Sequence, residues 1–506
     1  MVARGISAGA GGRAFSLGDL LAWLRDGNAA RPAGTSAKRQ VFATVTMSSL
    51  PAGSPPMEQG GLFVAVKGEK RDGHDFVANA FENGAIAALV NRVPGNLADA
   101  VTRGEVCVCQ PHGDVTKSDV PLLFMVDDPM LALQRCAGWW RRSQPARVLG
   151  ITGSVGKTTT KDLLSAVLAQ RGPLVSTRGN FNNELGLPFM LLELTPEHRA
   201  AVLEIGISAV GEMEAFARIA SPDVAIVTRV APAHLEGFSD VQTVQREKGQ
   251  LVAALGTDGV AVLNADDPLV LQMGSRSAGR VATFGEAPDA DVRAENVVLR
   301  GFEGVQFDLV RHGDRWPVLL PLVGRHFVSC ALAAAAAAFE EGCTGEQVAA
   351  GLGRPLSGRR LEPLALPSGV TLLDDTYNAS PAAMRAALDV LAETHGRRIA
   401  VLGDMFEMGA AGPRLHREVG EYVPQRADLL VAVGELSRHL AAAALDGGVE
   451  TGAAVWLETP EAAAEWLAAR LRPGDFVLVK GSRGMRMDRI VAALVGEHAP
   501  AEHGSH

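Results

Sequence analysis

The chain has 506 residues, too many for one ordinary hydrophobic core, so we expect several domains. Hydrophobic residues make up 47% and charged residues 21%, which is typical of a water-soluble globular protein. The formal net charge of -9, from 48 Lys and Arg against 57 Asp and Glu, argues against a nucleic-acid binder that relies on phosphate contacts.

The cysteines and the apolar segments favour a cytoplasmic protein. The five cysteines form no C-x-x-C pair and are odd in number, so we expect free thiols rather than disulfides or a zinc site. Residues 1–15 lack the apolar core of a signal peptide. The longest apolar run, 331–339, is mostly alanine and too short to span a bilayer, so we expect a tightly packed helix there and no membrane insertion.

Residues 1–144 form a first block of mixed α/β character. We expect strands at 62–66 and 87–90, with a helix at 75–83 between them. The first 38 or so residues contain an amphipathic helix near 17–25, followed by a stretch rich in Gly, Pro and Ala. We expect that stretch to be mobile.

The second block, residues 145–361, opens with a glycine-rich loop between a predicted strand and a predicted helix that runs from Thr158 to about Gln170. In such a loop the backbone N–H groups and the helix N-terminus face an anion, a lysine adds positive charge, and a threonine hydroxyl holds Mg²⁺. The residues expected to bind the phosphates of a nucleoside triphosphate are Gly153, Ser154, Val155, Gly156, Lys157, Thr158 and Thr159. The alternative is a tight turn with a chance Gly-Lys-Thr, which is left open by Ile151, where the general pattern has glycine.

Strands alternate with helical segments through the rest of the chain. The second block has apolar strands at 201–205, 224–228 and 260–264, and the third has them at 370–374, 398–402, 429–433, 455–457 and 476–479. This βαβ rhythm predicts two mostly parallel, doubly wound sheets, the last of them Rossmann-like, in which ligands gather beyond the carboxyl ends of the strands. The expected fold class is therefore α/β, in three domains that span 1–144, 145–361 and 362–506.

Polar residues near the predicted strand ends and domain boundary are candidates for chemistry. Glu204 ends a strand of the nucleotide domain, where a carboxylate suits Mg²⁺, although a surface or helix-capping glutamate is an equal alternative. His234 follows the next strand, and its alternative role is that of a hydrogen-bonded structural histidine. Asn264 and Asp266 suit contacts to nucleotide hydroxyls or the base, or else a plain turn. Arg359, at the second domain boundary, is placed to reach a transferring phosphate or to form an interdomain salt bridge.

Together these motifs resemble the Mur ligases of peptidoglycan synthesis. The family's loop, Thr-Gly-x-x-Gly-Lys-Thr, matches residues 152–158 and accounts for Ile151. Further matching runs, in the family's order, are Leu62–Glu69 with Asp72–Asp75, Gly179–Pro188, Ala233–Gly237, Asp374–Pro381, Val401–Met405 and Leu478–Met487. The likeness covers about residues 40–495, and its member-specific runs are most similar to the branch that uses D-Ala-D-Ala.

The resemblance implies an ATP-dependent, ADP-forming amide-bond ligase that joins D-Ala-D-Ala to UDP-N-acetylmuramoyl-tripeptide through an acyl phosphate. It implies ATP and two Mg²⁺ ions as cofactors, and a cytoplasmic monomer with no nucleic-acid partner. The residues that match the family's catalytic set are Lys157, His234, Lys248, Arg359 and Asp375. Its metal ligands are matched by Thr158, Glu204, His234 and Lys248, the last as a carbamate that turns a cation into an anion.

The resemblance also distributes the substrates over the three domains. The N-terminal domain would bind the UDP end of the precursor, the central domain would bind ATP, and the C-terminal domain would bind the incoming dipeptide. Nucleotide contacts beyond the loop would come from Asn264, Asp266, His326 and Arg359. Substrate contacts would come from Ser48, Lys67, Gly68, Asp72, His74, Asn182, Asn183, Asn378, Ser380, Lys480 and Ser482.

Several positions depart from the family's pattern. Thr46–Ser49 stands where Asp-Ser-Arg is usual, and Arg229 and Ser380 each replace an asparagine. Phe327 and Cys330 replace the two asparagines that usually reach adenine. The loss of one or two hydrogen bonds to the base costs about 1–3 kcal/mol, which weakens ATP binding rather than abolishes it. Phe327 is a candidate to stack on adenine instead.

Two alternatives to an active D-Ala-D-Ala ligase remain open. A divergent paralogue would bind nucleotide or precursor with little ligase activity; the missing asparagines favour it, and the intact loop, Glu204, His234 and Lys248 argue against it. A Mur-like ligase with another amino-acid substrate is disfavoured by the runs 374–381 and 478–487. The sequence leaves open whether the third residue of the tripeptide is diaminopimelate or lysine.

Overall fold

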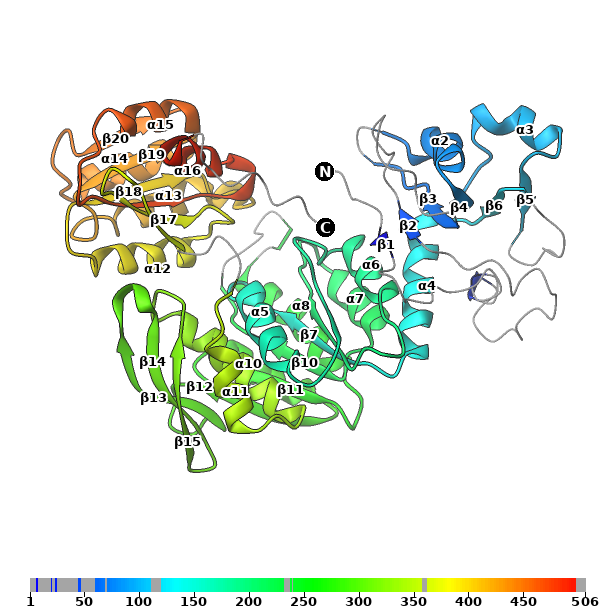
Figure 1. Cartoon of the computed structure of the whole chain (residues 1–506), viewed down its shortest axis with the longest axis horizontal. Coiled ribbons are helices and arrows are strands. Elements are labelled where there is room, and N and C mark those ends of the chain that lie inside the picture. Colours follow the sequence, from blue (N-terminus) through cyan, green and yellow to red (C-terminus); the bar gives the residue numbers. More distant parts are fainter. Residues whose placement is uncertain are drawn as a thin grey trace.

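The computed structural model describes residues 60–68, 71–110, 120–231, 237–238, 240–356 and 362–496, with the backbone of 6–7 and 44–46 and residues 20 and 23–24 (Figure 1). These residues form three β-sheets that follow one another along the chain. Ser48, His234 and Arg359, which the sequence predicts in the site, lie outside the described residues. So does most of the expected N-terminal helix with the stretch after it.

The first sheet has short strands in the order β1-β2-β3-β4-β6-β5. The strands are β1 (Ile6–Ser7), β2 (Thr44–Thr46), β3 (Gly61–Val64), β4 (Ala85–Val90), β5 (Cys107–Cys109) and β6 (Leu122–Met125), and the helical segments are η1 (Gly73–Phe76), α2 (Val77–Glu82), η2 (Gly95–Leu97) and α3 (Ala98–Thr102). Neighbours from β2 to β5 run parallel, and β1 is antiparallel to β2. The predicted strands and helix of this block correspond to β3, β4 and the η1–α2 segment.

Helix α4 (Pro129–Ser143) connects the first sheet to the second. It begins where the Asp128 carboxylate accepts a hydrogen bond from the N–H of Met130 at 2.7 Å, which satisfies an otherwise unpaired donor of the first turn. Near its other end the Trp140 indole N–H donates to the Leu194 carbonyl at 2.9 Å. The helix is thereby fixed to the central part of the molecule.

The second sheet has the order β15-β14-β13-β12-β11-β10-β7-β9-β8. Its strands are β7 (Arg147–Thr152), β8 (Leu174–Ser176), β9 (Ala200–Glu204), β10 (Val224–Val227), β11 (Val260–Asn264), β12 (Arg280–Gly285), β13 (Val292–Leu299), β14 (Val305–Arg311) and β15 (Asp314–Leu320). Its helices are α5 (Lys157–Leu168), α6 (Gly186–Leu192), α7 (Glu212–Ala220), α8 (Val241–Ala253), α9 (Pro268–Leu271), η3 (Gln272–Arg276), η4 (Gly301–Glu303), α10 (Phe327–Glu340) and α11 (Gly345–Leu352). The strands from β8 to β13 are parallel as predicted, whereas β13, β14 and β15 form an antiparallel extension that the sequence analysis did not foresee.

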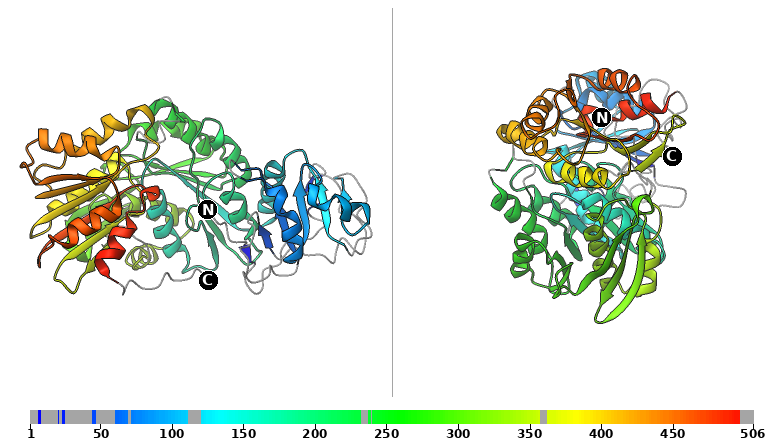
Figure 2. Two further views of the ribbon diagram at one scale, coloured as in Figure 1. Left: turned by 90° about the horizontal axis from the view of Figure 1, so that it is seen from above. Right: turned by 90° about the vertical axis from the view of Figure 1, so that its left-hand side faces the viewer.

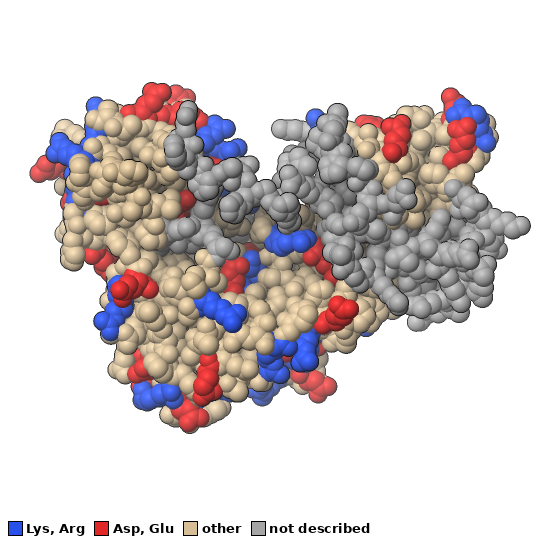
Figure 3. Space-filling model, in the orientation of Figure 1, with Lys and Arg blue, Asp and Glu red and all other residues tan. Residues whose placement is uncertain are grey.

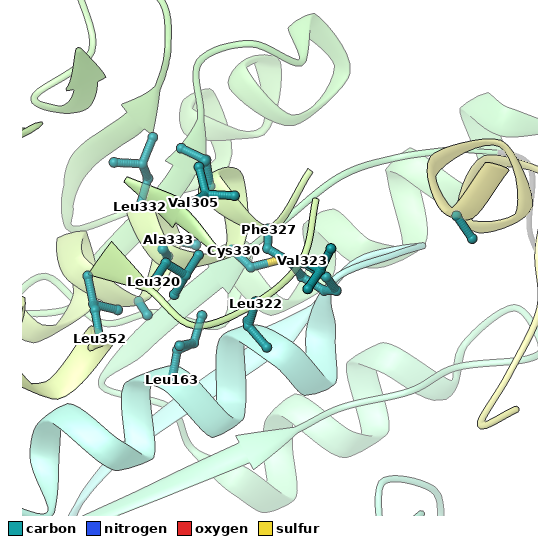
Figure 4. Packing of buried hydrophobic residues seen from close by; sticks show 14 of the residues in the cluster. Leu163, Val305, Leu320, Leu322, Val323, Phe327, Cys330, Leu332, Ala333 and Leu352 are labelled. Carbon is teal, nitrogen blue, oxygen red and sulfur yellow. The ribbon is translucent and has the colours of Figure 1, made fainter. Parts of the chain in front are cut away.

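Helix α10 forms the centre of the packing on one face of this sheet (Figure 4). Its alanines at 333–335 are completely buried, so the helix approaches α5 and the sheet closely, and Leu163 of α5 belongs to the same cluster. The tightly packed helix predicted for 331–339 is therefore confirmed. Apolar residues of α7 and α8 belong to a separate cluster with the other face of the strands.

The third sheet has the order β16-β17-β21-β18-β19-β20. Its strands are β16 (Glu362–Ala365), β17 (Thr371–Asp375), β18 (Arg398–Gly403), β19 (Leu429–Val433), β20 (Ala454–Leu457) and β21 (Phe476–Lys480), and its helices are α12 (Pro381–Ala392), η5 (Gly409–Ala411), α13 (Gly412–Gly420), α14 (Ser437–Asp446), α15 (Pro460–Ala468), η6 (Arg483–Met485) and α16 (Asp488–Val495). All neighbours except the antiparallel β16–β17 pair run parallel. The doubly wound arrangement predicted for the third block is observed.

The first and third sheets lie at opposite ends of the molecule, with the second between them (Figures 1 and 2). The β13–β14 connection reaches the C-terminal unit, where the ring of Phe302 stacks on Phe476 with centroids 5.7 Å apart. Acidic and basic side chains are interspersed over the central unit on the face shown in Figure 3. Within the described ranges, no helix has both the length and the apolar character needed to cross a membrane.

Candidate active site

The glycine-rich loop joins the end of β7 to the start of α5, as predicted. Gly153 and Gly156 have φ values of 151° and 85°, which side-chain-bearing residues rarely adopt. The Lys157 ammonium bends back over the loop and donates to the Gly153 carbonyl at 2.8 Å. The loop therefore has the strand, the left-handed glycines and the helix N-terminus that a phosphate site requires.

The loop is held in place by the segment that follows β10. The Thr228 hydroxyl donates to the Val155 carbonyl at 2.6 Å. The Ser154 N–H donates to the Arg229 carbonyl at 2.7 Å, and the Ser154 hydroxyl donates to the Ala231 carbonyl at 2.8 Å. Arg229 thus supports the loop through its backbone, which any residue type provides, while its side chain is exposed. Thr228 is not among the residues predicted for the site, and its position at the end of a buried strand was the available signal.

Glu204 is the last residue of β9 and is only 4% exposed. One carboxylate oxygen, Oε1, accepts a hydrogen bond from the Asn182 amide at 2.9 Å. The other, Oε2, is buried and has no hydrogen-bond partner among the described residues. A buried oxygen without a donor fits a hard cation such as Mg²⁺, because an ionised carboxylate left unpaired inside a protein is strongly unfavourable.

Lys248 lies on α8 with only 1% of its surface exposed. Burial lowers the pKa of its ammonium group well below the ordinary value, and the positive charge of Lys157 lowers the pKa further. The side chain therefore favours a neutral amine, the form that reacts with CO₂ to give a carbamate. This environment is compatible with the predicted role of Lys248 as a carbamylated metal ligand.

The remaining residues predicted to bind metal and phosphate are only partly described. Thr158 is the second residue of α5, after Lys157, and is half-buried, and Thr159 is 2% exposed. Among the described residues no three His, Cys, Asp or Glu side chains form a complete metal cluster. The expected contributions of His234 and Arg359 therefore stay predictions.

A buried ion pair marks the strand ends of the C-terminal unit. The Lys480 ammonium lies 2.6 Å from a carboxylate oxygen of Asp375 and donates to the Asn378 carbonyl at 2.9 Å. These three predicted residues are thus brought together. The Ser380 hydroxyl instead caps α12, and the Ser482 hydroxyl accepts a hydrogen bond from the Phe406 N–H at 2.8 Å. Both serines shape the loops around the pair, and their contact with a dipeptide stays a prediction.

His326 of the central unit faces this ion pair across the boundary between the units. A Cβ atom added to Gly324 would lie 2.7 Å from the His326 ring and 2.8 Å from Val390 of α12, so the units are in close contact here. The ring retains exposed surface, but the protein around it lowers the pKa of His326, with Asp375 and Lys480 as the nearest charges. His326 therefore lies at the surface of the central unit that contacts the C-terminal unit, where the dipeptide is predicted to bind.

At the expected nucleoside end, two predicted side chains are already engaged. The Asn264 amide donates to the Thr228 carbonyl at 2.8 Å, and the Asp266 carboxylate accepts from the N–H groups of Glu286 and Ala287 at 2.8 and 2.9 Å. Both side chains hold loops at strand ends, which agrees with the alternative that these residues form a plain turn. Contacts from these side chains to the nucleotide remain predictions.

The two residues that replace the adenine-binding asparagines lie in the core. Phe327 is 6% exposed and packs near Leu322 in the α10 cluster (Figure 4). Its ring presents little surface for stacking, so the expectation that Phe327 stacks on adenine is not supported by its position. Cys330 is 8% exposed, and a Cβ atom on Gly156 would lie 3.0 Å from its sulfur. The residue thus packs behind the phosphate loop.

In the N-terminal unit, three predicted substrate residues, Lys67, Gly68 and Asp72, belong to one small hairpin, and a fourth, His74, lies beside it in η1. Lys67 pairs with Asp72 across it, and Gly68 closes it by donating its N–H to the Arg71 carbonyl at 2.9 Å. His74 is 2% exposed, and its Nδ1 and Nε2 atoms are bonded to the Asp72 carboxylate and the Asn91 N–H. His74 therefore supports the hairpin, and substrate contact by this ring would require it to break those bonds.

The chain matches three family models in sequence order. They are the Mur ligase family catalytic domain over residues 47–125, the Mur ligase middle domain over 151–338 and the Mur ligase glutamate ligase domain over 359–483. The chain belongs to the Mur ligase family. The family models thus cover the phosphate loop, Glu204, Lys248 and the Asp375–Lys480 pair.

Individual Mur ligases are similar over nearly their whole length. The UDP-N-acetylmuramoyl-tripeptide–D-alanyl-D-alanine ligase of Escherichia coli strain K12 is 36% identical over 462 residues, covering 89% of this chain and 94% of the relative. Among solved structures, MurF from Acinetobacter baumannii has a TM-score of 0.80 at 29% identity, covering 95% of this chain and 98% of that chain. MurF from Thermotoga maritima in complex with ADP has a TM-score of 0.73 at 26% identity, covering 89% and 96%. The predicted family and fold class are confirmed.

Proposed function

We propose that this chain is the ATP-dependent ligase that joins D-Ala-D-Ala to UDP-N-acetylmuramoyl-tripeptide and releases ADP and phosphate. The observation that carries the proposal is the combination of a complete phosphate loop with the buried, half-satisfied carboxylate of Glu204 and the buried side chain of Lys248, which is 1% exposed. Relatives with this activity in their names align with almost the entire chain. The proposed location is the cytoplasm, and the proposed state is a monomer.

In the first step, the terminal carboxylate of the tripeptide attacks the γ-phosphorus of ATP, the bond to the β-phosphate oxygen breaks, and an acyl phosphate and ADP form. An anion approaches an anion in this step, so positive charge and N–H donors must lie around the phosphoryl group. The loop amides and Lys157 supply both. Thr158, Glu204, carbamylated Lys248 and His234 would hold Mg²⁺, which when bound neutralises phosphate charge.

In the second step, the amine of D-Ala-D-Ala attacks the acyl carbon, loses a proton and expels phosphate through a tetrahedral intermediate. The Asp375–Lys480 pair and the Asn378 loop lie on the unit proposed to bind this dipeptide. His326 lies where the central unit contacts the C-terminal unit, and Arg359 is the residue that the sequence predicts for the same boundary. Closure at this boundary would bring the amine to the acyl phosphate and exclude water, which would otherwise hydrolyse the intermediate.

The divergent paralogue has no observation in its favour. Two of the substitutions that suggested a paralogue leave the phosphate loop intact. Arg229 supports the loop by its backbone, and Cys330 packs behind it. The proposed ATP site also includes Asn264 and Asp266, with side chains that hold the neighbouring loops.

A reconstituted reaction tests the proposal. The protein is incubated with ATP, Mg²⁺, D-Ala-D-Ala and either the diaminopimelate or the lysine form of UDP-muramoyl-tripeptide. The expected result is phosphate release that depends on every substrate, together with the pentapeptide product by mass spectrometry. Phosphate release that stays at background with all substrates present would overturn the ligase assignment.

A further inference from the structure

Residues 179–186, called loop 179–186 below, run from the β8–α6 connection to the first residue of α6; they lie over the end of β9 and are attached there at Asn182. The Asn182 carbonyl accepts a hydrogen bond from the Gly206 N–H at 2.8 Å, while its side-chain amide donates to Glu204 Oε1 at 2.9 Å. A Cβ atom on Gly206 would lie 3.2 Å from that amide nitrogen, closer than most Cβ contacts. Asn182 is therefore held at two points, and Gly206 leaves the room that this requires.

The contact with Asn182 determines how the Glu204 carboxylate is oriented. The backbone of Glu204 is fixed separately, because its N–H donates to the Thr177 hydroxyl at 2.9 Å. Thr177 is in turn held by the Lys161 ammonium, which donates to the Thr177 carbonyl at 2.9 Å. With Oε1 occupied by Asn182, the unpaired oxygen is Oε2. Asn182 thus fixes which oxygen is free for a cation, and partners that orient metal-binding carboxylates commonly affect metal affinity.

The same loop is in contact with the C-terminal unit. The Tyr377 hydroxyl donates to the Gly179 carbonyl at 3.3 Å, a long distance for an O–H···O bond. Tyr377 lies between Asp375 and Asn378, whose carboxylate and carbonyl both bind Lys480. The segment proposed to contact the dipeptide therefore also contacts the loop that orients Glu204.

We propose that loop 179–186 couples the position of the C-terminal unit to the orientation of the metal-binding carboxylate of Glu204. Asn182 is the positioning residue for Glu204, and Tyr377 connects the loop to the segment proposed to contact the dipeptide. A small displacement of the Tyr377 segment moves the loop at Gly179, and the loop moves the amide that holds Oε1. The coupling is reciprocal, so occupancy of the metal site and of the dipeptide site favour each other. This inference rests on the proposed function for the metal-binding role of Glu204 and for the identity of the dipeptide.

Metal affinity tests the role of Asn182 without catalysis. Mn²⁺ binding in the presence of ADP is measured by electron paramagnetic resonance for the parent protein and for Asn182→Ala and Gly206→Ala. We expect both variants to bind Mn²⁺ about 10- to 100-fold more weakly. Gly206→Ala retains the asparagine and displaces only its amide, so it guards against a folding defect peculiar to the first variant. Unchanged Mn²⁺ affinity in either folded variant would overturn the positioning role.

Gln134→Ala is the matched control for the loop. The Gln134 amide donates to the Glu184 carbonyl of the same loop at 3.2 Å, a hydrogen bond that involves neither Asn182 nor Glu204. We expect this variant to bind Mn²⁺ as the parent does. An equal loss of affinity in Gln134→Ala would show that general loosening of the loop is responsible, and would overturn the specific role of Asn182.

The link through Tyr377 is tested by adding D-Ala-D-Ala to the ADP and UDP-muramoyl-tripeptide complex, which cannot react. In the parent we expect the dipeptide to raise Mn²⁺ affinity at least about fivefold. We expect Tyr377→Phe to lose this increase and Tyr422→Phe, at the other tyrosine of the chain, to retain it. A full increase in Tyr377→Phe, or no increase in a parent that binds the dipeptide, would overturn the coupling. A parent that does not bind the dipeptide at all would contradict the proposed function, while the Mn²⁺–ADP result for Asn182 would stand.

Discussion

Gly153 and Thr228 are so close that a Cβ atom on Gly153 would lie 1.9 Å from the threonine hydroxyl. The same hydroxyl donates to the Val155 carbonyl of the phosphate loop, so the loop and the Thr228 segment cannot simply move apart. Gly153→Ala is therefore expected to distort the loop and to weaken ATP binding by about 100-fold or more, the effect of losing several charge-assisted hydrogen bonds. Isothermal titration with an ATP analogue measures the change. Gly256→Ala, where nothing lies within 4 Å of the added methyl, should bind as the parent does, and equal weakening in both variants would contradict the steric explanation.

The strands of the parallel sheets were predictable because they are buried on both faces and appear as continuous apolar runs. The predicted strand 260–264 coincides with β11, and 429–433 coincides with β19. The β13–β15 extension was missed because its strands alternate: β15 has exposed residues between buried ones, and a short alternating segment gives a weak signal among charged residues.

The candidate site was predictable only in part. The loop motif located the turn between β7 and α5 directly, because its spacing follows from one local geometry. Lys248 stands in a charged helical run whose default interpretation is a solvated face, yet it is 1% exposed. Its burial depends on how α8 packs against the sheet, which no local pattern encodes. The contact of Asn182 with Glu204 joins two loops far apart in sequence and needed the structure.

Lys248→Ala is expected to lower ligase activity by about 100-fold or more, as when one group that stabilises transition-state charge is removed. Added acetate or formate should restore part of the activity, because a small carboxylate can occupy the position of the carbamate. Lys248→Arg should be as inactive as the alanine variant, since a guanidinium cannot be carbamylated. Steady-state phosphate release checks all three; full activity of either variant would rule out the carbamate role.

Asp375→Ala is expected to destabilise the C-terminal unit, because it leaves the Lys480 ammonium, with only 3% of its side chain exposed, without its carboxylate partner. Removing one partner of a buried pair typically costs about 3–5 kcal/mol. Chemical denaturation measures the free energy of unfolding. Arg489→Ala breaks a surface pair with Glu461 in the same unit and should cost less than about 1 kcal/mol. Similar losses in the two variants would contradict a buried, mutually dependent pair.

Phe302→Ala is expected to loosen the contact between the β13–β14 connection and the C-terminal unit. The stacking of Phe302 on Phe476 contributes about 0.5–1.5 kcal/mol. Its loss should therefore shift the equilibrium between the packed and the detached positions of the C-terminal unit a few-fold. Small-angle X-ray scattering should show a broader distribution of shapes, while ADP affinity stays unchanged. Leu319→Ala removes another exposed apolar side chain of the same extension and should leave the scattering curve unaltered. Identical curves for Phe302→Ala and the parent would show that the stacking does not hold the unit.

The lowered pKa of His326 predicts a loss of stability in mild acid. Although His326 retains exposed surface, the protein packed around its ring removes part of the water and lowers its pKa from 6.5 to about 4, and Asp375 and Asp389 partly oppose the shift. Between these two pH values the unfolded chain binds the proton and the folded protein does not, so stability falls as the pH decreases from about 6.5 toward 4. Denaturation of the parent and of His326→Gln at pH 5 and pH 7.5 isolates this contribution, because the carboxylates titrate in both proteins. The parent should lose more stability than the variant, and equal losses would show that His326 is protonated as readily in the folded protein as in the unfolded chain.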